Sequence, residues 1–553
     1  MVGAARIVSS SSAFFQTSDE GLHVACGVLW ARSGHDFFCL DEPPLARIAS
    51  VVPLFLNGDL TGLPENAQSA REVQGVFRGK YERTLRLARL GVLPFFVAAS
   101  WLVWVWARRG FGEGPALASV FLFQALPLVL AHSGLVTTDM AATALIPLVF
   151  YLGIRWLKEP SPARSVVLGV VAGLAILAKH SAFPFLLAGS LPIAIAKSIE
   201  KARAREEMPP SWIRRLSSLL VVGILVITVV WAGYRFSLTP IAVASGRPHS
   251  VFRFLRIDRA LSDHPRALQT LDRLLESPMP FGDFLRGTRL VASHNAVGHP
   301  AFFLGEVREF GWWQFFPVLL AVKTPIPFLV FAGIGVVLLR RTGQGPAWQR
   351  LAPALAAAGI LLLSIGSRID IGLRHLLPIF PLLAIPAGVG LHQLLSARKQ
   401  RVACRLGAAL LIAWFVASSV SAHPDYLPYF NELAAGHPER ITVDSDLDWG
   451  QDIKRLFAVL TPLRAEKLFY ACVGCSYLRS AGDLGVPGTP KILEELEPYR
   501  GVSGWIAVDE WAIAVKGEME RRRQGGKERG FDWLGEFPFR RIGRSIRLYR
   551  VPG

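Results

Sequence analysis

The sequence predicts an all-α polytopic membrane protein with a small α/β domain at its C-terminal end. Of its 553 residues, 52% are hydrophobic and only 18% are charged, whereas soluble proteins are about 25% charged. The apolar residues form long blocks, and the basic residues behind the net charge of +18 gather in short stretches between those blocks, as in membrane proteins. This composition excludes a soluble multidomain enzyme, a disordered chain and, with only five cysteines, a disulfide-rich scaffold.

Ten apolar segments are candidates for membrane spans, which need about 17–25 mostly apolar residues. They are 85–107, 116–131, 141–157, 166–178, 182–197, 216–234, 315–340, 351–366, 373–392 and 404–421. Every second connection carries arginines or lysines, namely 108–115, 155–165, 197–215, 340–350 and 397–405. The positive-inside rule places these connections in the cytoplasm. The turns near Asp139 and Lys179 and the loop 235–314 are therefore expected on the outer side.

The chain is thus expected to have three parts. Residues 1–84 form an N-terminal segment with the first outer loop, residues 85–421 form the helix bundle, and residues 422–553 form an extracytoplasmic α/β domain. In this last part the charges return, and the short apolar runs Lys467–Cys472 and Trp505–Val508 predict strands.

The chain start and the cysteines give weaker signals. Residues 1–15 are too short and too rich in serine to cross a membrane, although a span should precede an outer loop. Either the start is truncated or the start codon is misplaced, and we expect the second. Cys26 and Cys39 could pair in the first outer loop. Cys472 and Cys475 form a lone CxxC, whereas a zinc site would need a second pair. No metal site is predicted there.

Polar residues that could perform chemistry gather at the outer ends of the spans, where ionisable groups are usually functional. The candidates are Asp19, Glu20, Arg47, Asp139, Lys323, Arg374 and His375. Ordinary explanations also exist, since Asp19 or Asp139 could cap a helix. Lys323 could snorkel to the interface, and Arg374 could anchor a span. Because the topology places all the candidates on one leaflet, they predict a site for an amphiphile with an anionic head group, which arginine and lysine can bind.

Nine segments, in order along residues 17–480, carry a family resemblance. They are Thr17–His23, Glu42–Arg47, Leu135–Met140, Leu177–Ser181, Gly298–Gly305, Gly311–Pro327, Gly372–Gly388, Tyr426–Leu433 and Val443–Leu456. Through them the chain resembles the bacterial protein O-mannosyltransferase-like group (glycosyltransferase family 39) of the C-type membrane glycosyltransferases. The resemblance implies a C-type helix bundle that transfers a sugar, mannose by family default, from a polyprenyl-phosphate carrier to a hydroxyl acceptor. It implies inversion at the anomeric carbon and a site on the outer face of the bacterial inner membrane.

The resemblance also implies roles for the candidates. Asp19 would be the general base, Glu20 would orient it or the acceptor, and Asp139 would hold the acceptor or support the base. The residues implied to hold phosphate are Arg47, Arg374, His375 and Lys323. One carboxylate suffices because phosphate is already a good leaving group, unlike the leaving group of a glycosidase. The family usually has histidine or lysine before the Pro-Pro pair, but this chain has Glu42, which cannot neutralise phosphate.

Some C-type relatives use a divalent cation, so Asp19, Glu20 and Asp139 could hold magnesium or manganese, which prefer oxygen ligands. The four aspartates in 444–452 do not follow EF-hand spacing and predict a structural or acceptor-contact segment. The expected partners are the lipid-linked donor, a protein, lipid or glycan acceptor, and the bilayer, without nucleic acid. Two other functions stay open, a lipid-linked sugar transporter or flippase and a non-catalytic polyprenyl-phosphate-binding protein. Transporters tend to place polar sites near the midplane of repeated halves, a pattern not evident in this sequence.

Overall fold

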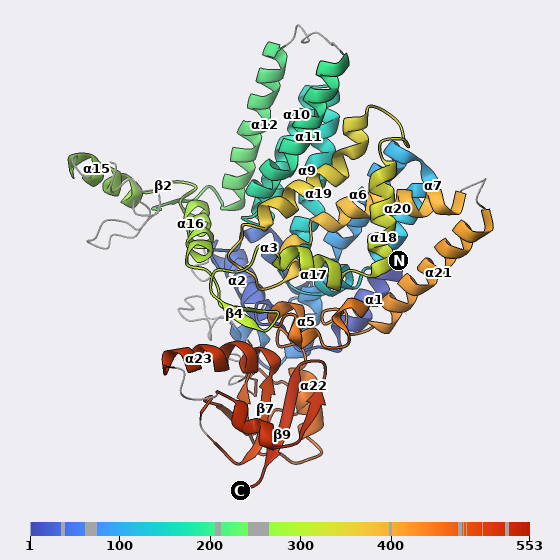
Figure 1. Cartoon of the computed structure of the whole chain (residues 1–553). Helices are drawn as coiled ribbons and strands as arrows, with labels where there is room; N and C mark the ends of the chain where they lie inside the picture. Colours follow the sequence, from blue (N-terminus) through green and yellow to red (C-terminus); the bar gives the residue numbers. More distant parts are fainter. Residues whose placement is uncertain are drawn as a thin grey trace.

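The protein is a helix bundle with a small sheet domain at one end (Figure 1). The computed structural model describes residues 2–34, 39–60, 74–204, 212–241, 265–396, 401–473, 478, 481–482, 484–499, 501–525 and 530–553. The bundle and the C-terminal mixed α/β domain confirm the predicted fold class.

Within the described residues, seven helices are long and apolar enough to cross a membrane. They are α5 and α6 together (Tyr81–Phe111), α9 (Asp139–Lys158), α11 (Ala182–Ala204), α12 (Trp212–Gly233), α19 (Ala347–Ser364), α20 (Ile379–Ser396) and α21 (Arg401–Ser421). Two bent pairs raise this number to nine, and the remaining predicted span, 166–178, is the shorter apolar helix α10 (Pro162–Ala178). The chain is therefore a multi-pass membrane protein.

Proline breaks two of the predicted spans. Helix α7 (Glu113–Gln124) meets α8 (Pro127–Ser133) at 65°, and α17 (Phe315–Lys323) meets α18 (Ile326–Leu338) at 112°. Proline lacks an N–H group and disfavours helical backbone in the residue before it. Pro127 therefore begins α8 and Pro325 directly precedes α18, each in a new direction. Thus 315–340 is not one continuous span, and Lys323 lies at the turn between two half-helices.

The predicted span 373–392 also begins differently from expectation. The structure forms a 3-10 turn, η2 (Leu373–Leu376), and the α-helix starts only at Ile379. Arg374 and His375 therefore lie on a turn before the helix, where the backbone can direct their side chains sideways into the protein.

The first part of the chain covers this end of the bundle. It comprises α1 (Val2–Ser11), α2 (Glu20–Ser33), α3 (Pro44–Leu56) and η1 (Gln74–Phe77). Cys26 of α2 and Cys39 form a disulfide, so one of the pairings left open by the sequence is present. Cys472 is also disulfide-bonded, and Cys475 lies outside the described residues.

The described parts of 235–314 form two short antiparallel strand pairs and two helices. These are β1 (Leu238–Thr239) with β2 (Met279–Pro280), β3 (Ala301–Phe303) with β4 (Glu306–Arg308), α15 (Pro265–Glu276) and α16 (Gly282–Val297).

The C-terminal domain is built on a five-stranded sheet in the order β6-β5-β7-β9-β8. The strands are β5 (Lys467–Ala471), β6 (Ile492–Glu495), β7 (Gly504–Asp509), β8 (Phe539–Ile542) and β9 (Ile546–Val551), with helices α22 (Ile453–Leu460) and α23 (Gly517–Arg523). Strands β6, β5 and β7 are parallel, whereas β9 is antiparallel to β7 and β8.

A shared hydrophobic core fixes this domain to the start of the chain. Val24 and Val28 of α2 belong to the same buried cluster as Leu456 and Phe457 of α22 and Leu468 of β5. Burial of such side chains stabilises by about 1.5–3 kcal/mol each, so the domain is firmly packed beside the turn that carries Asp19.

Candidate active site

Arg374 is the centre of a cluster that joins three distant parts of the chain. Its side chain is largely buried, and its Nη1 lies 3.5 Å from Oδ2 of Asp19 and 3.6 Å from Oδ2 of Asp139. Asp19 precedes α2, Asp139 begins α9 and Arg374 lies on η2. The structure thus brings together three of the seven residues proposed from the sequence.

Neither acidic motif is used for helix capping. Asp19 occupies the N-cap position of α2 and Thr138 that of α9, but neither side chain makes a capping hydrogen bond. The Asp19 carboxylate instead accepts a hydrogen bond from the Ser18 hydroxyl at 3.1 Å and is 36% exposed. It is therefore accessible to a substrate while facing a buried cation.

Lys179 is a site residue that the sequence analysis did not select. Its ammonium group is hydrogen-bonded to Oδ1 of Asp139, whereas Oδ2 of Asp139 is buried without a hydrogen-bond partner. Lys179 directly follows α10, at the end of an apolar segment. The positive-inside rule leaves the outer side poor in cations. A lysine at the outer end of an apolar segment was therefore the sequence signal that could have identified Lys179.

Glu20 is separated from this cluster by its own ion pair. Its two oxygens accept hydrogen bonds from Nε and Nη2 of Arg89 at 2.9 and 2.7 Å, and both side chains are buried. The same carboxylate accepts the backbone N–H groups of Thr17 at 2.8 Å and Val136 at 2.9 Å. Glu20 therefore joins the Asp19 turn to the segment that leads into Asp139.

Lys323 supports the turn that carries Arg374. Its ammonium donates to the carbonyl oxygen of Leu427 at 2.9 Å and lies 3.5 Å from Oδ1 of Asp446. The Asp446 carboxylate in turn accepts the backbone N–H of Leu373 at 3.1 Å. Lys323 is thus bonded to protein oxygens, and the structure does not bring it into direct contact with Asp19 or Asp139.

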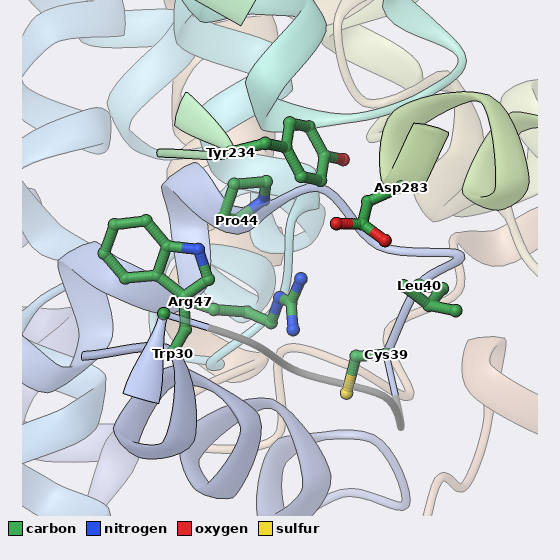
Figure 2. Close-up of a pocket in the computed structure, with 8 residues that line it drawn as sticks. Trp30, Cys39, Leu40, Pro44, Arg47, Tyr234 and Asp283 are labelled. Atoms are coloured by element: carbon green, nitrogen blue, oxygen red, sulfur yellow. The ribbon is translucent and has the colours of Figure 1, made fainter. Parts of the chain in front are cut away.

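Arg47 lies in a pocket of its own (Figure 2). The pocket is lined by Trp30, Gly34, Cys39, Leu40, Pro44, Arg47, Tyr234 and Asp283. The Arg47 side chain extends into it, and burial lowers the pKa of its guanidinium to about 10. Arg47 remains a cation at neutral pH and could bind an anionic group there.

Several buried polar atoms of the Arg374 cluster have no hydrogen-bond partner among the described residues. They are Nδ1 of His132, Oγ1 of Thr137, Oδ2 of Asp139, Nε of Arg374 and Nε2 of His375. Burial, together with the positive charges of Lys179 and Arg374, holds the pKa of His375 well below its usual value, so its ring is neutral. Buried polar groups are nearly always satisfied, so these atoms suit a polar ligand.

The opposite charges of this cluster support one another. Burial lowers the pKa of Arg374, but the carboxylates of Asp139 and Asp19 outweigh burial and raise it above its usual value. The pKa of Glu42 is raised by burial, although His23 and Lys179 lower it. Glu42 therefore interacts electrostatically with the cluster. It is an acid at the position where the family resemblance implies histidine or lysine.

The three predicted metal ligands do not form a cation site. Both oxygens of Glu20 are occupied by Arg89 and backbone N–H groups, and Asp139 is bonded to Lys179. No group of three His, Cys, Asp or Glu side chains suited to a metal occurs within the part of the chain that the structure describes. These residues do not fit magnesium or manganese.

Residues 82–232 match the family described as dolichyl-phosphate-mannose-protein mannosyltransferase. No curated protein matches the chain by sequence. Among solved structures, ArnT from Cupriavidus metallidurans bound to undecaprenyl phosphate is 15% identical, with a TM-score of 0.49, and the match covers 100% of this chain and 98% of that chain.

A second solved structure, the archaeal oligosaccharyltransferase AglB from Archaeoglobus fulgidus in complex with an inhibitory peptide and a dolichol-phosphate, is 16% identical with a TM-score of 0.42. That match covers 91% of this chain and 61% of AglB. The match over residues 82–232 agrees with the family resemblance drawn from the motifs.

Proposed function

We propose that this glycosyltransferase moves a sugar from a polyprenyl-phosphate carrier to a hydroxyl acceptor, with Asp19 as the general base. The family description, a lipid-phosphate-mannose-dependent mannosyltransferase, supports this donor class and favours mannose as the sugar. The positive-inside pattern of the loops favours an active site on the outer face of the inner membrane.

In the proposed reaction the acceptor oxygen attacks the anomeric carbon from the face opposite the phosphate. Asp19 takes the hydroxyl proton as the new glycosidic bond forms, and the bond between the anomeric carbon and the phosphate oxygen breaks. The electron pair leaves on the polyprenyl phosphate, so the configuration at the anomeric carbon inverts. A base positioned in this way typically contributes about 10²–10⁴-fold to the rate.

Arg374 would neutralise the departing phosphate. Its Nη1 is held by two carboxylates at 3.5 and 3.6 Å rather than by close hydrogen bonds, and its Nε is unsatisfied. A guanidinium in this condition has donors available for phosphate oxygens, and preorganised cations of this type stabilise charge that develops in the transition state. Arg47, in the pocket of Figure 2, would add a second cation for the lipid phosphate.

The observation that carries the proposal is that Asp19 lies beside the buried Arg374. The Asp19 carboxylate is partly exposed and makes no helix-capping hydrogen bond. Asp139 would hold the acceptor or support the base through the same arginine, with its charge balanced by Lys179. Glu20 and Lys323 act in this proposal by fixing the turns beside Asp19 and Arg374.

The test compares Asp19→Asn with Asp425→Asn in purified full-length protein supplied with labelled polyprenyl-phosphate sugar. Asp425 is a matched control because it is a partly exposed carboxylate paired with an arginine, Arg455, at 2.6 Å. We expect Asp19→Asn to reduce transfer by about 10³-fold with donor binding retained, and Asp425→Asn to transfer normally. Normal transfer by Asp19→Asn would refute the base assignment. Donor translocation without transfer by the wild type would favour a flippase.

A further inference from the structure

The segment Val443–Leu456 contains four aspartates and a tryptophan, and the proposed reaction does not use them. Trp449 is buried in this segment. The guanidinium carbon of Arg374 lies 4.0 Å from the centre of its ring, and His132 packs against the ring with an edge-to-face geometry at 6.5 Å. Trp449 therefore contacts the cation at the centre of the active site.

The backbone of the same residue holds the turn that carries Asp19. The carbonyl oxygen of Trp449 accepts the N–H of Ser18 at 2.9 Å, and the carbonyl oxygen of Gln451 accepts the N–H of Phe15 at 3.0 Å. The Gln451 side chain accepts the N–H of Trp449 itself at 2.7 Å. One short segment thus binds the residue next to the base through its backbone and Arg374 through a ring.

This segment is in turn attached to the C-terminal domain. The Asp448 carboxylate accepts hydrogen bonds from the N–H of Gly450, at 2.7 Å, and from the hydroxyl of Ser545. Asp452 accepts the N–H of Arg544 at 3.0 Å. Ser545 and Arg544 belong to the turn between β8 and β9, so the position of Trp449 is fixed by the edge of the sheet.

The stacking has a geometric consequence for Arg374. A guanidinium is planar, and when it stacks on an aromatic ring it uses its face and leaves the N–H donors on its edge for other partners. Those edge donors are the ones that approach Asp19 and Asp139. An unstacked Arg374 could rotate, and its N–H groups would no longer point to the place where phosphate charge develops.

We propose that Trp449 is a positioning residue that holds the Arg374 guanidinium in a fixed orientation beside Asp19. The C-terminal domain fixes the position of Trp449 through the β8–β9 turn. The inference rests on the proposed function, because it assigns Arg374 to the phosphate. In this proposal the aspartate-rich segment Val443–Leu456 connects the sheet domain to the residues around Arg374.

The experiment compares Trp449→Leu, Trp449→Phe and Trp505→Leu in the full-length protein. Trp505 is the matched control, because Arg550 stacks on it at 5.1 Å in the C-terminal sheet, away from Arg374. We expect Trp449→Leu to lower kcat/KM for the donor by about 10²-fold, the usual effect of a displacement of about 1 Å. Trp449→Phe, which keeps a stacking face, should retain most of the activity, and Trp505→Leu should be unchanged.

A double-mutant cycle separates positioning from general packing. Lysine cannot stack as a planar fork, so Trp449→Leu should cost little in an Arg374→Lys background, whereas independent effects would multiply. Multiplying effects, or a folded Trp449→Leu variant with wild-type kcat/KM, would overturn the inference.

Two further variants keep the inference testable. If Trp449→Leu does not fold, Ser545→Ala tests whether the β8–β9 turn positions Trp449, since it removes only the hydroxyl that anchors Asp448. It should lower kcat several-fold. An unchanged kcat would overturn the inference that the C-terminal domain positions Trp449. Asp19→Asn in the same assay distinguishes the two claims. An active Asp19→Asn variant refutes the proposed base, whereas an inactive one beside a fully active Trp449→Leu refutes this inference alone.

Discussion

Asp19 and Glu20 are adjacent carboxylates with opposite environments. Glu20 is fully buried, and all four of its donors, two from Arg89 and the N–H groups of Thr17 and Val136, lie at 2.7–2.9 Å. Asp19 is 36% exposed, and its arginine partner is 3.5 Å away. The Glu20 carboxylate already accepts four hydrogen bonds and has no acceptor site left for a substrate. The Asp19 carboxylate still has acceptor sites available. Hydrogen-bond saturation thus separates a scaffold group from a group available for chemistry.

The two arginines differ in the same way. Arg89 donates to both oxygens of Glu20 and to the carbonyl oxygens of Ser11, Phe14 and Phe15. Arg374 has two longer ion pairs, an unsatisfied Nε and a tryptophan ring against its face. Arg89 therefore stabilises one arrangement of the chain, while Arg374 keeps donors for the proposed phosphate.

The largest expected effect comes from breaking the saturated pair. Removing one member of a buried ion pair typically costs about 3–5 kcal/mol, because the other charge is left uncompensated. We therefore expect Glu20→Ala to lower the thermal unfolding midpoint strongly. Asp19→Ala should change the free energy of unfolding by only about 0.5 kcal/mol or less, and so leave the midpoint nearly unchanged. The double variant Glu20→Leu with Arg89→Met should recover part of the loss. Equal unfolding midpoints for Glu20→Ala and Asp19→Ala would contradict the comparison.

The second effect is on activity rather than stability. Lysine keeps the charge of Arg374 but lacks its planar fork, so Arg374→Lys should reduce kcat/KM for the donor by about 10²-fold with a nearly unchanged unfolding midpoint. The matched variant Arg89→Lys should instead lower the midpoint. Transfer assays and thermal unfolding on both proteins measure this crossover, and parallel changes in both quantities for both variants would refute it.

The fold was largely predictable because hydropathy and charge are strong local signals. Apolar length and alternating basic loops located the spans, and short apolar runs marked β5 and β7 of the sheet. The positions of the breaks, at Pro127 and Pro325, were not predicted, although proline was visible at both. At membrane depth a helix break is tolerated only when protein surrounds it, and that surrounding is a tertiary property.

The site was predictable as a list of residues but not as a geometry. Motifs selected Asp19, Asp139 and Arg374, which the structure brings together. The same motifs grouped Glu20 with Asp19, because sequence cannot show that Arg89, 69 residues away, saturates Glu20. Trp449 was missed for a related reason. A lone tryptophan in a loop has no periodicity, and its role follows only from the two contacts that it makes.

Asp444 provides a finer test of the reaction centre. It is half-buried and adopts a left-handed backbone conformation with φ of 66°. Burial raises the pKa of its carboxyl to about 7, in the field of Arg374 and Asp19. As pH rises through 7, this group gains a negative charge that competes with phosphate for Arg374. We expect the donor KM of the wild type to rise about three- to fivefold from pH 6 to pH 8, and that of Asp444→Asn to stay flat. An identical rise in both proteins would show that Asp444 does not act on Arg374.

Asp370 shows whether an unsatisfied oxygen is by itself a sign of function. It is buried, its Oδ2 accepts the N–H of Trp312 at 2.7 Å, and its Oδ1 has no hydrogen-bond partner. Burial raises its pKa to about 7, and the Trp312 hydrogen bond opposes this only in part. If saturation alone separated scaffold from chemistry, Asp370 would belong with Asp19. The cluster around Arg374 suggests instead that an unsatisfied acceptor also needs a nearby cation.

Asp370→Asn distinguishes these two rules through stability. A carboxyl whose pKa is raised in the folded protein above its unfolded value of about 3.9 binds more protons when folded. Its contribution to stability is therefore lost as pH rises from about 4 to 7. Asparagine can still accept the Trp312 N–H and never carries the buried charge, so the variant should unfold a few degrees higher than the wild type at pH 8 and no higher at pH 4. Transfer should be unaffected. A variant that lost transfer while gaining stability would show that Asp370 belongs to the reaction centre, and that saturation is the sufficient rule.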